Sequence, residues 1–236
     1  MTLPVAILAG GLATRMRPLT ERIPKSLLDI QGEPFVFRQL SCLARRGVTR
    51  VVFCVGFLGD MVREAVGDGS RWGIEIAWSF DGEKLLGTAG ALRKALPLLG
   101  KRFLILYGDS YLECDYPAVE QAFLRSGLQG IMTVYENTDR WDGSNVLMRD
   151  GRIVIYDKKV HAPGMRHIDY GLGGLSEDAL LSRGEAAPCD LAAVYQELIA
   201  RGQLAAFEAP ARFYEIGSPA GLEELRLYFA DKEGKV

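Results

Sequence analysis

The residues that build most metal centres and disulfide frameworks are scarce in this chain. It contains two histidines. Its four cysteines, Cys42, Cys54, Cys114 and Cys189, lie far apart in the sequence and form no CxxC pair. This spacing matches neither a zinc motif nor a disulfide framework, so we expect four reduced thiols.

Two further absences narrow the class of protein. Lys and Arg number 28 against 30 Asp and Glu, so no overall positive charge would attract nucleic acid. No stretch reaches the roughly 18 apolar residues that a membrane span needs, and the first residues lack the basic start of a secretion signal. We therefore expect a soluble, cytoplasmic protein that binds neither nucleic acid nor membranes. Any anion site must be local.

The chain has 236 residues, of which 48% are hydrophobic, so it can bury one sizeable core. Apolar runs of strand length alternate with helical patterns, and most of these runs are continuous, which is typical of buried parallel strands. The expected strands are Val5–Ala9, Arg50–Val55, Ile74–Ser79, Phe103–Tyr107 and Ile131–Tyr135. This alternation predicts an α/β fold with an open, mostly parallel sheet flanked by helices on both faces. Ligands of such folds bind beyond the carboxyl ends of the strands.

The helical patterns carry their own start and stop signals. EPFVFRQLSCLARRG places Pro34 at the first helical position and Gly47 at the end. TAGALRKALPLLG is expected to end near Leu96, because Pro97 disfavours a helical conformation at the residue before it.

After residue 135 the pattern changes to shorter elements. A hairpin is expected from Asn145–Met148 and Arg152–Tyr156 around Asp150-Gly151, a pair that tolerates positive φ. Asp190 and Ser218 are expected to cap two later helices. No repeat or linker interrupts the sequence, which predicts a single domain over residues 1–236.

The stretch AILAGGLATRMRPLTERIPKSLLDI, Ala6 to Ile30, follows the first expected strand. Gly10 and Gly11 let backbone N–H groups approach an oxygen-rich ligand closely. Thr14 adds a hydroxyl, and cationic donors follow at Arg15, Arg17 and Lys25. Together they indicate a polyphosphate, since guanidinium and ammonium groups both pair with phosphate.

On the glycines alone, an ordinary tight turn is favoured over a phosphate site. The spacing also excludes two well-known phosphate loops, because neither GxxxxGK[ST] nor GxGxxG occurs here.

The whole stretch, however, closely resembles GGxGTRxxPLTxxxPKxLxxI, the signature of sugar-1-phosphate nucleotidyltransferases. The matching residues are Gly10, Gly11, Thr14, Arg15, Pro18, Leu19, Thr20, Pro24 and Lys25. One departure is Ala13, where the family usually has glycine. The resemblance implies a Rossmann-like nucleotidyltransferase fold. It also implies an enzyme that converts a nucleoside triphosphate and a sugar 1-phosphate to an NDP-sugar and pyrophosphate with Mg²⁺ as cofactor.

Further segments resemble the family along nearly the whole chain: LLGTAGAL, LILYGDSYL, RWDGSNV, YDKK, IDYGLGGL and FYEIGSPAGL. The resemblance implies a nucleotide site at Leu8, Ala9, Gly10, Gly11, Ala13, Thr14, Arg15, Gly87, Thr88 and Ala89. It implies a sugar-phosphate site at Lys25, Gly143, Asn145, Asp157, Lys158, Asp169 and Gly171. Residues 1–135 would thus mainly bind the nucleotide and residues 136–236 mainly the sugar.

The implied catalytic residues are Arg15, Lys25 and Asp109. Asp109 and Glu215 would bind Mg²⁺, although Glu215 stands where the family commonly has aspartate. Asp169 likewise replaces the usual asparagine. Arg15 would stabilise the departing pyrophosphate, and Lys25 would hold the attacking phosphate in line.

Several alternatives stay open at this point. A non-catalytic relative that binds a sugar nucleotide would keep the same fold, and a dinucleotide-dependent oxidoreductase would share the α/β layers. GTP with a heptose or mannose-type 1-phosphate is the first expectation for substrates, with UTP, dTTP or CTP and another sugar phosphate as alternatives. The oligomeric state is open, and a homo-oligomer is one outcome. Trp141 is as well suited to packing as to contact with a sugar.

Overall fold

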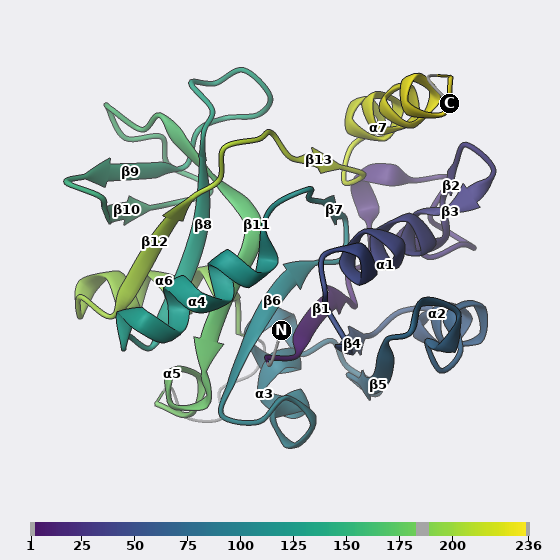
Figure 1. The fold of residues 1–236 in the computed structure, drawn as a ribbon, viewed down its shortest axis with the longest axis horizontal. Helices are drawn as coiled ribbons and strands as arrows, with labels where there is room; N and C mark the ends of the chain where they lie inside the picture. Colours follow the sequence, from purple (N-terminus) through teal and green to yellow (C-terminus); the bar gives the residue numbers. More distant parts are fainter. Residues whose placement is uncertain (1–2, 183–188, 235–236) are drawn as a thin grey trace.

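The computed structural model describes residues 3–182 and 189–234. Within these residues nine strands form one twisted sheet (Figure 1). They are β1 (Val5–Ala9), β4 (Arg50–Val55), β5 (Glu75–Phe80), β6 (Arg102–Tyr107), β8 (Gly130–Glu136), β9 (Val146–Arg149), β10 (Arg152–Tyr156), β11 (His167–Ser176) and β12 (Leu204–Glu208). The predicted α/β architecture is confirmed. The predicted strand at 74–79 begins one residue later, and two predicted strands match at both ends.

The sheet runs in the order β10-β9-β11-β6-β1-β4-β5, with β8 and β12 joined through β11. Strands β6, β1, β4 and β5 are mutually parallel. The chain moves outward from β1 to β4 and β5, then returns to β6 on the other side of β1. A crevice therefore opens at the carboxyl ends of β1 and β6, where the direction of winding reverses.

One grouping of the predicted strands was wrong. The run at 131–135 was placed among parallel strands, but β8 pairs in parallel only with β12 and is antiparallel to β11. Both of its faces are buried, with Ile131 in one apolar layer and Met132 and Val134 in the other, so it has the same continuous apolar sequence as a parallel strand.

Two apolar layers cover the sheet because its side chains alternate between faces. Val5 and Ile7 of β1 pack on the layer that includes α1 (Phe35–Arg45), α2 (Gly59–Val66) and α4 (Tyr116–Ser126). Ala6 between them packs on the opposite layer, which includes α3 (Gly87–Leu99), α5 (Glu177–Leu181) and α6 (Leu191–Ala200). In Figure 1, α1 and α3 lie on opposite sides of the central strands.

Two predicted helix limits were wrong. Helix α3 does not stop before Pro97 but continues to Leu99, because Leu92, Ala95 and Leu99 are all buried against the sheet. Helix α1 starts at Phe35, and Pro34 before it is extended at φ −55°, ψ 140° because it pairs with Asp29. Here burial and strand pairing override the local signals.

The second half adds the β9–β10 hairpin and a small substructure around the C-terminal helix. Asp150 and Gly151 both have positive φ in the hairpin turn, as predicted. Strand β13 (Tyr214–Glu215) pairs with β7 (Ser110–Tyr111), and β2 (Asp29–Ile30) pairs with β3 (Glu33–Pro34). Helix α7 (Pro219–Glu233) follows β13 and packs near β2 (Figure 1).

Both predicted caps are present. The Asp190 carboxylate accepts a hydrogen bond from the Ala192 amide, and the Ser218 hydroxyl accepts one from the Gly221 amide. Among the residues that the structure describes, no helix is long and apolar enough to cross a membrane.

Candidate functional site

The crevice between β1 and β6 holds a cavity of about 350 Å³. Its wall includes the glycine-rich loop after β1 and the turn after β6. Gly108 of that turn lies so close to β1 that a Cβ would stand 2.5 Å from the Leu8 carbonyl oxygen. Only glycine fits there, and it brings the next residue, Asp109, to the rim of the cavity.

The loop after β1 is held in shape by its own residues. Ala13 adopts the left-handed conformation at φ 47°, ψ 41°. The glycine usual in the family would take this conformation without strain, whereas alanine costs about 1–2 kcal/mol. The Thr20 hydroxyl donates a hydrogen bond to the Ala13 carbonyl at 2.8 Å and closes the loop. The conformation is therefore kept despite the missing glycine.

Four functional groups meet at the far end of this loop. The Lys25 ammonium lies 2.7 Å from Oδ2 of Asp109. A Cβ on Gly217 would lie 3.0 Å from that oxygen, 2.7 Å from Oε2 of Glu215 and 3.2 Å from Nη2 of Arg15. The pairing of β13 with β7 brings Glu215 to this point, because Glu215 is opposite Ser110, the residue after Asp109.

The two carboxylates suit a hard divalent cation. Mg²⁺ is usually bound by one or two carboxylates, with water and substrate phosphates completing its coordination. Asp109 and Glu215 converge on a space that any side chain at position 217 would fill. The described residues contain no cluster of three or more His, Cys, Asp or Glu side chains that could bind a metal alone. Substrate oxygens would have to complete such a site.

Glu215 is held tightly in place. Its Oε2 accepts a hydrogen bond from the Gly217 amide, and its Oε1 accepts one from the Ser218 hydroxyl at 2.5 Å. Gly221 of α7 provides the space for this longer side chain, since a Cβ there would lie 1.9 Å from Oε1 of Glu215.

A second cavity of about 430 Å³ adjoins the first and lies beside the β9–β10 hairpin. Its lining includes Gly143, Asn145, Asp157, Lys158 and Asp169, all of which were predicted for the sugar phosphate. Tyr107 and Lys158 line both cavities. A ligand in one cavity can therefore lie next to a ligand in the other.

A buried network fixes Lys158 at this junction. Its ammonium lies 3.2 Å from the Tyr107 hydroxyl and 3.9 Å from Oδ2 of Asp169. The same Asp169 oxygen accepts hydrogen bonds from Tyr107 at 3.1 Å and from Tyr156 at 2.7 Å. Burial, and next the Asp169 charge, raises the pKa of Tyr107 well above its ordinary value. The hydroxyl therefore stays protonated and donates.

The structure places most predicted nucleotide residues in the first cavity: Leu8, Ala9, Gly10, Gly11, Ala13, Gly87 and Thr88. Thr14 and Ala89 do not line it, and the Ala89 amide donates to the Cys189 carbonyl at 2.9 Å. Arg15 lines the second cavity.

Of the other predicted site residues, Lys25 and Asp109 line the first cavity, while Gly171 and Glu215 line neither. Gly171 acts through backbone shape: it has φ +93°, and a Cβ there would lie 2.7 Å from the Ser110 hydroxyl oxygen. Trp141 lines neither cavity and stacks beneath the Arg212 guanidinium at 3.5 Å.

Sequence reasoning missed Tyr107, Tyr156 and Asp81. The two tyrosines end apolar strands and read as core residues, so no local signal marked them. Asp81 could have been found, because it lies two residues after the predicted strand at 74–79 and so at the carboxyl edge of the sheet.

Comparison with known proteins agrees with this geometry. A family model, Nucleotidyl transferase, matches residues 5–141. N-acetylmuramate alpha-1-phosphate uridylyltransferase from Neisseria meningitidis is 43% identical over 116 residues, 49% of this chain and 50% of that protein. Mannose-1-phosphate guanyltransferase beta-B from Xenopus laevis is 32% identical over 222 residues, 90% of this chain and 61% of that protein. The chain thus matches between half and two thirds of the length of these relatives.

A solved structure shows the same fold. The structure of a glucose-1-phosphate thymidylyltransferase from Bacillus anthracis in complex with a sucrose has a TM-score of 0.84 at 20% identity, covering 95% of this chain and 94% of that one. The resemblance drawn from the signature loop and the predicted fold class are both confirmed. This chain belongs to the nucleotidyl transferase family.

Proposed function

We propose that this protein is a sugar-1-phosphate nucleotidyltransferase, which converts an NTP and a sugar 1-phosphate to an NDP-sugar and pyrophosphate. The observation that carries the proposal is the pair of adjoining cavities that share Tyr107 and Lys158. The nucleotide would occupy the first cavity, formed mainly by residues before 136. The sugar phosphate would occupy the second, formed mainly by residues after 136. One domain would then hold both substrates.

The chemistry requires two polyanions to approach each other. An oxygen of the sugar 1-phosphate attacks the α-phosphorus of the triphosphate, and pyrophosphate leaves. Lys25 in the first cavity, Arg15 in the second and Lys158 in both supply positive charge to the two substrates. Positioning and charge neutralisation are the main sources of catalysis in phosphoryl-type transfer, and the attacking phosphate needs no general base because it is already ionised.

In this proposal Lys158 holds the sugar phosphate and Lys25 orients the attacking oxygen. Arg15 stabilises charge that develops on the departing pyrophosphate. Mg²⁺ bound by Asp109 and Glu215 would supply further neutralisation of the phosphate oxygens. Lys25 would then leave Asp109, to which it is paired at 2.7 Å, and turn to the phosphates.

For substrates we propose GTP and a heptose or mannose-type 1-phosphate. The frog relative is a mannose-1-phosphate guanyltransferase and aligns with 90% of this chain, which supports this choice. The meningococcal relative is an N-acetylmuramate alpha-1-phosphate uridylyltransferase, so UTP with that sugar phosphate is the principal alternative.

The test is release of pyrophosphate with Mg²⁺ present. GTP, UTP, CTP, ATP and dTTP are each combined with mannose, glucose, heptose and N-acetylmuramate 1-phosphates. We expect release with one nucleotide and one sugar phosphate, and none with the sugar phosphate omitted. Nucleotide binding without release in any combination would contradict the proposed activity and favour a sugar-nucleotide-binding protein.

A further inference from the structure

An acidic side chain, Asp81, lines the first cavity on the side away from Lys25. Asp81 directly follows β5, and its amide continues the sheet ladder by donating to the Val55 carbonyl at 2.8 Å. Its carboxylate lies 3.5 Å from where a Cβ of Gly10 would be and 3.3 Å from where a Cβ of Gly56 would be. A side chain at either glycine would therefore crowd the Asp81 carboxylate, which lines the first cavity.

The position of Asp81 in the sheet separates it from Lys25 and Asp109, the part of the first cavity where the phosphates are proposed to bind. Asp81 follows β5 and Asp109 follows β6, and β4 and β1 lie between these strands. Three strand spacings place the two residues about 14 Å apart across the sheet. A carboxylate beside the triphosphate would repel it, whereas one at this distance can face the uncharged base.

The surroundings of Asp81 suit a flat, largely apolar ring. Leu8, Cys54, Phe57 and Leu85 line the same cavity. At the rim, Phe57 and Leu85 are 42% and 39% exposed, so they offer apolar surface that a base would cover.

The Asp81 carboxylate keeps capacity for a ligand. Within residues 3–182 and 189–234 its one hydrogen-bond donor is the Leu86 amide, at 3.3 Å to Oδ2. Lys94, the nearby cation, donates instead to the Asp81 backbone carbonyl at 3.1 Å. Burial raises the pKa of Asp81, while the Leu86 amide and Lys94 partly oppose the rise. Pairing with donors on a ligand would offset this cost of burial.

A carboxylate only accepts hydrogen bonds, and the bases differ in what they offer it. Guanine has two adjacent donors, the ring N1–H and the exocyclic N2 amine, which match both carboxylate oxygens. Uracil and thymine have one N–H between two carbonyl oxygens, and those oxygens would face the carboxylate unfavourably. Adenine and cytosine place a ring acceptor beside their amine.

We propose that Asp81 reads the nucleobase and makes this enzyme select guanine. The inference rests on the proposed nucleotidyltransferase function and decides between its two leading nucleotides. The discriminating contact is a bidentate pair from guanine N1–H and N2–H to the Asp81 carboxylate. Such pairs discriminate between bases by roughly 10- to 100-fold.

The test compares the binding of GTP, inosine triphosphate and UTP to the purified protein by titration calorimetry. Inosine triphosphate is GTP without the N2 amine, so it reports on one of the two hydrogen bonds. We expect the wild type to bind GTP about 10-fold more tightly than inosine triphosphate and more tightly than UTP. Asp81→Asn and Asp81→Ala should both reduce the preference for GTP over inosine triphosphate to near unity.

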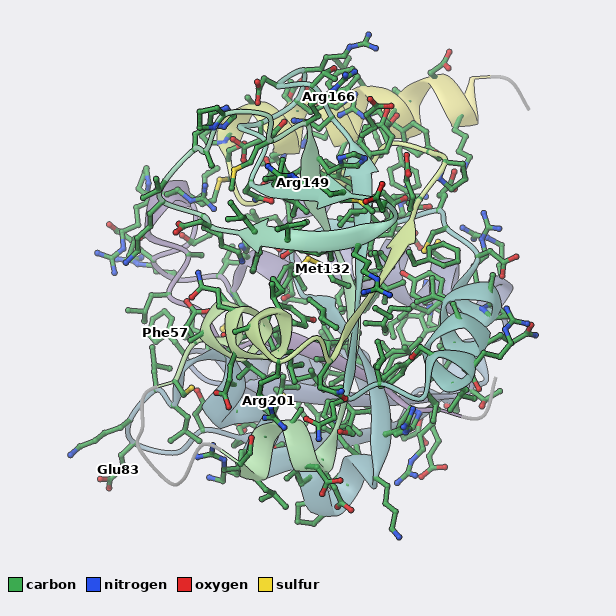
Figure 2. All side chains as sticks on the ribbon, turned by 90° about the vertical axis from the view of Figure 1, so that its left-hand side faces the viewer. Phe57, Glu83, Met132, Arg149, Arg166 and Arg201 are labelled. Carbon is green, nitrogen blue, oxygen red and sulfur yellow. The ribbon has the colours of Figure 1, made fainter. Side chains whose placement is uncertain are left out.

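Glu83→Gln is the matched control, because Glu83 is two residues away on an exposed loop. Figure 2 shows its side chain pointing away from the body of the molecule. This variant should keep the wild-type preference. Tighter binding of UTP than GTP, or an unchanged GTP preference in both Asp81 variants, would overturn the role of Asp81 and leave the enzyme activity standing. Failure of the wild type to bind any triphosphate would instead overturn the proposed function.

Discussion

The Lys25 ammonium and Oδ2 of Asp109 form an ion pair at 2.7 Å, with side chains that are 22% and 26% exposed. The pair joins the residue proposed to orient the attacking phosphate to the residue proposed to bind Mg²⁺. A cation on Asp109 must therefore compete with Lys25, and the released lysine becomes available to the phosphates. Because the pair is partly solvated, the exchange costs little.

Lys25→Ala should lower kcat for pyrophosphate release by about 100- to 1,000-fold, because one preorganised donor to the reacting phosphates is lost. The dissociation constant for the nucleotide should change by no more than about fivefold, since a partly exposed charge contributes little to ground-state binding. Steady-state kinetics and calorimetry measure the two quantities separately. A large loss of affinity with normal kcat would mean that Lys25 only binds.

Asp109→Ala should reduce Mg²⁺-dependent turnover by at least about 100-fold while leaving the fold intact, because the main protein ligand for the cation is removed. The measurement is pyrophosphate release across a Mg²⁺ titration, with circular dichroism to check folding. The control is Asp60→Asn, which changes an exposed carboxylate at the start of α2. Near-normal activity of a folded Asp109→Ala enzyme would refute the metal assignment.

The sequence predicted much of the first half of the fold, because its signals there are local. Each apolar run forms a buried strand, and the signature loop follows β1 and leads to Lys25 in the cavity. The second half depends on long-range pairing. Strand β11 pairs with β6, β8 and β9 and carries a bulge between Asp169 and Gly173, none of which a single sequence specifies.

The site residues divide in the same way, into those marked by a local motif and those placed by long-range pairing. Lys25 and Asp109 were predictable because each belongs to a recognisable motif. The role of Asp169 was not, because its partner Tyr107 lies 62 residues away and only the folded sheet brings the two together. The sequence suggested that Asp169 contacts the sugar. In the structure Asp169 lines the second cavity, and its carboxylate accepts hydrogen bonds from Tyr107, Tyr156 and the Gly171 amide, which the sequence did not indicate.

Asp169→Asn should therefore weaken binding of the sugar phosphate indirectly, by removing the charge that holds Lys158. We expect KM for the sugar 1-phosphate to rise about 10-fold with little change in KM for the nucleotide. Lys158→Ala should have a similar effect, and the double variant should be no worse than either single variant. Fully additive losses would show that Asp169 acts independently of Lys158.

Gly221→Ala should disturb Glu215, because the new methyl group would stand 1.9 Å from Oε1 and 2.6 Å from the backbone oxygen of that residue. Such overpacking should lower the free energy of unfolding by about 1–3 kcal/mol. Mn²⁺ binding, measured by electron paramagnetic resonance with nucleotide present, should weaken about 10-fold. Ala220→Ser, an exposed change in the same turn, should alter neither quantity. Unchanged Mn²⁺ binding in Gly221→Ala would remove Glu215 from the metal site.

Glu113 gives a prediction for stability against pH. It accepts hydrogen bonds from Lys232 and Tyr228, each at 2.5 Å, which tie α7 to the segment after β7. Burial is the largest single influence and would raise the pKa of Glu113, but the hydrogen bonds from Lys232, Tyr228 and Tyr111 and the Lys232 charge together lower the pKa below its ordinary value. A carboxylate whose pKa is lower in the folded than in the unfolded protein stabilises the fold at pH values above its unfolded pKa. This contribution is lost as the pH falls through the folded pKa.

The free energy of unfolding should thus decline between about pH 5 and pH 3, and Glu113→Gln should flatten that decline. At pH 7 the variant should be less stable by about 1 kcal/mol, since solvent screens a partly exposed network. Urea unfolding at several pH values measures both effects. Glu64→Gln, which alters an exposed glutamate of α2, should keep the wild-type profile. If Glu113→Gln kept the same slope between pH 5 and pH 3, the contacts of Glu113 would contribute nothing to acid sensitivity.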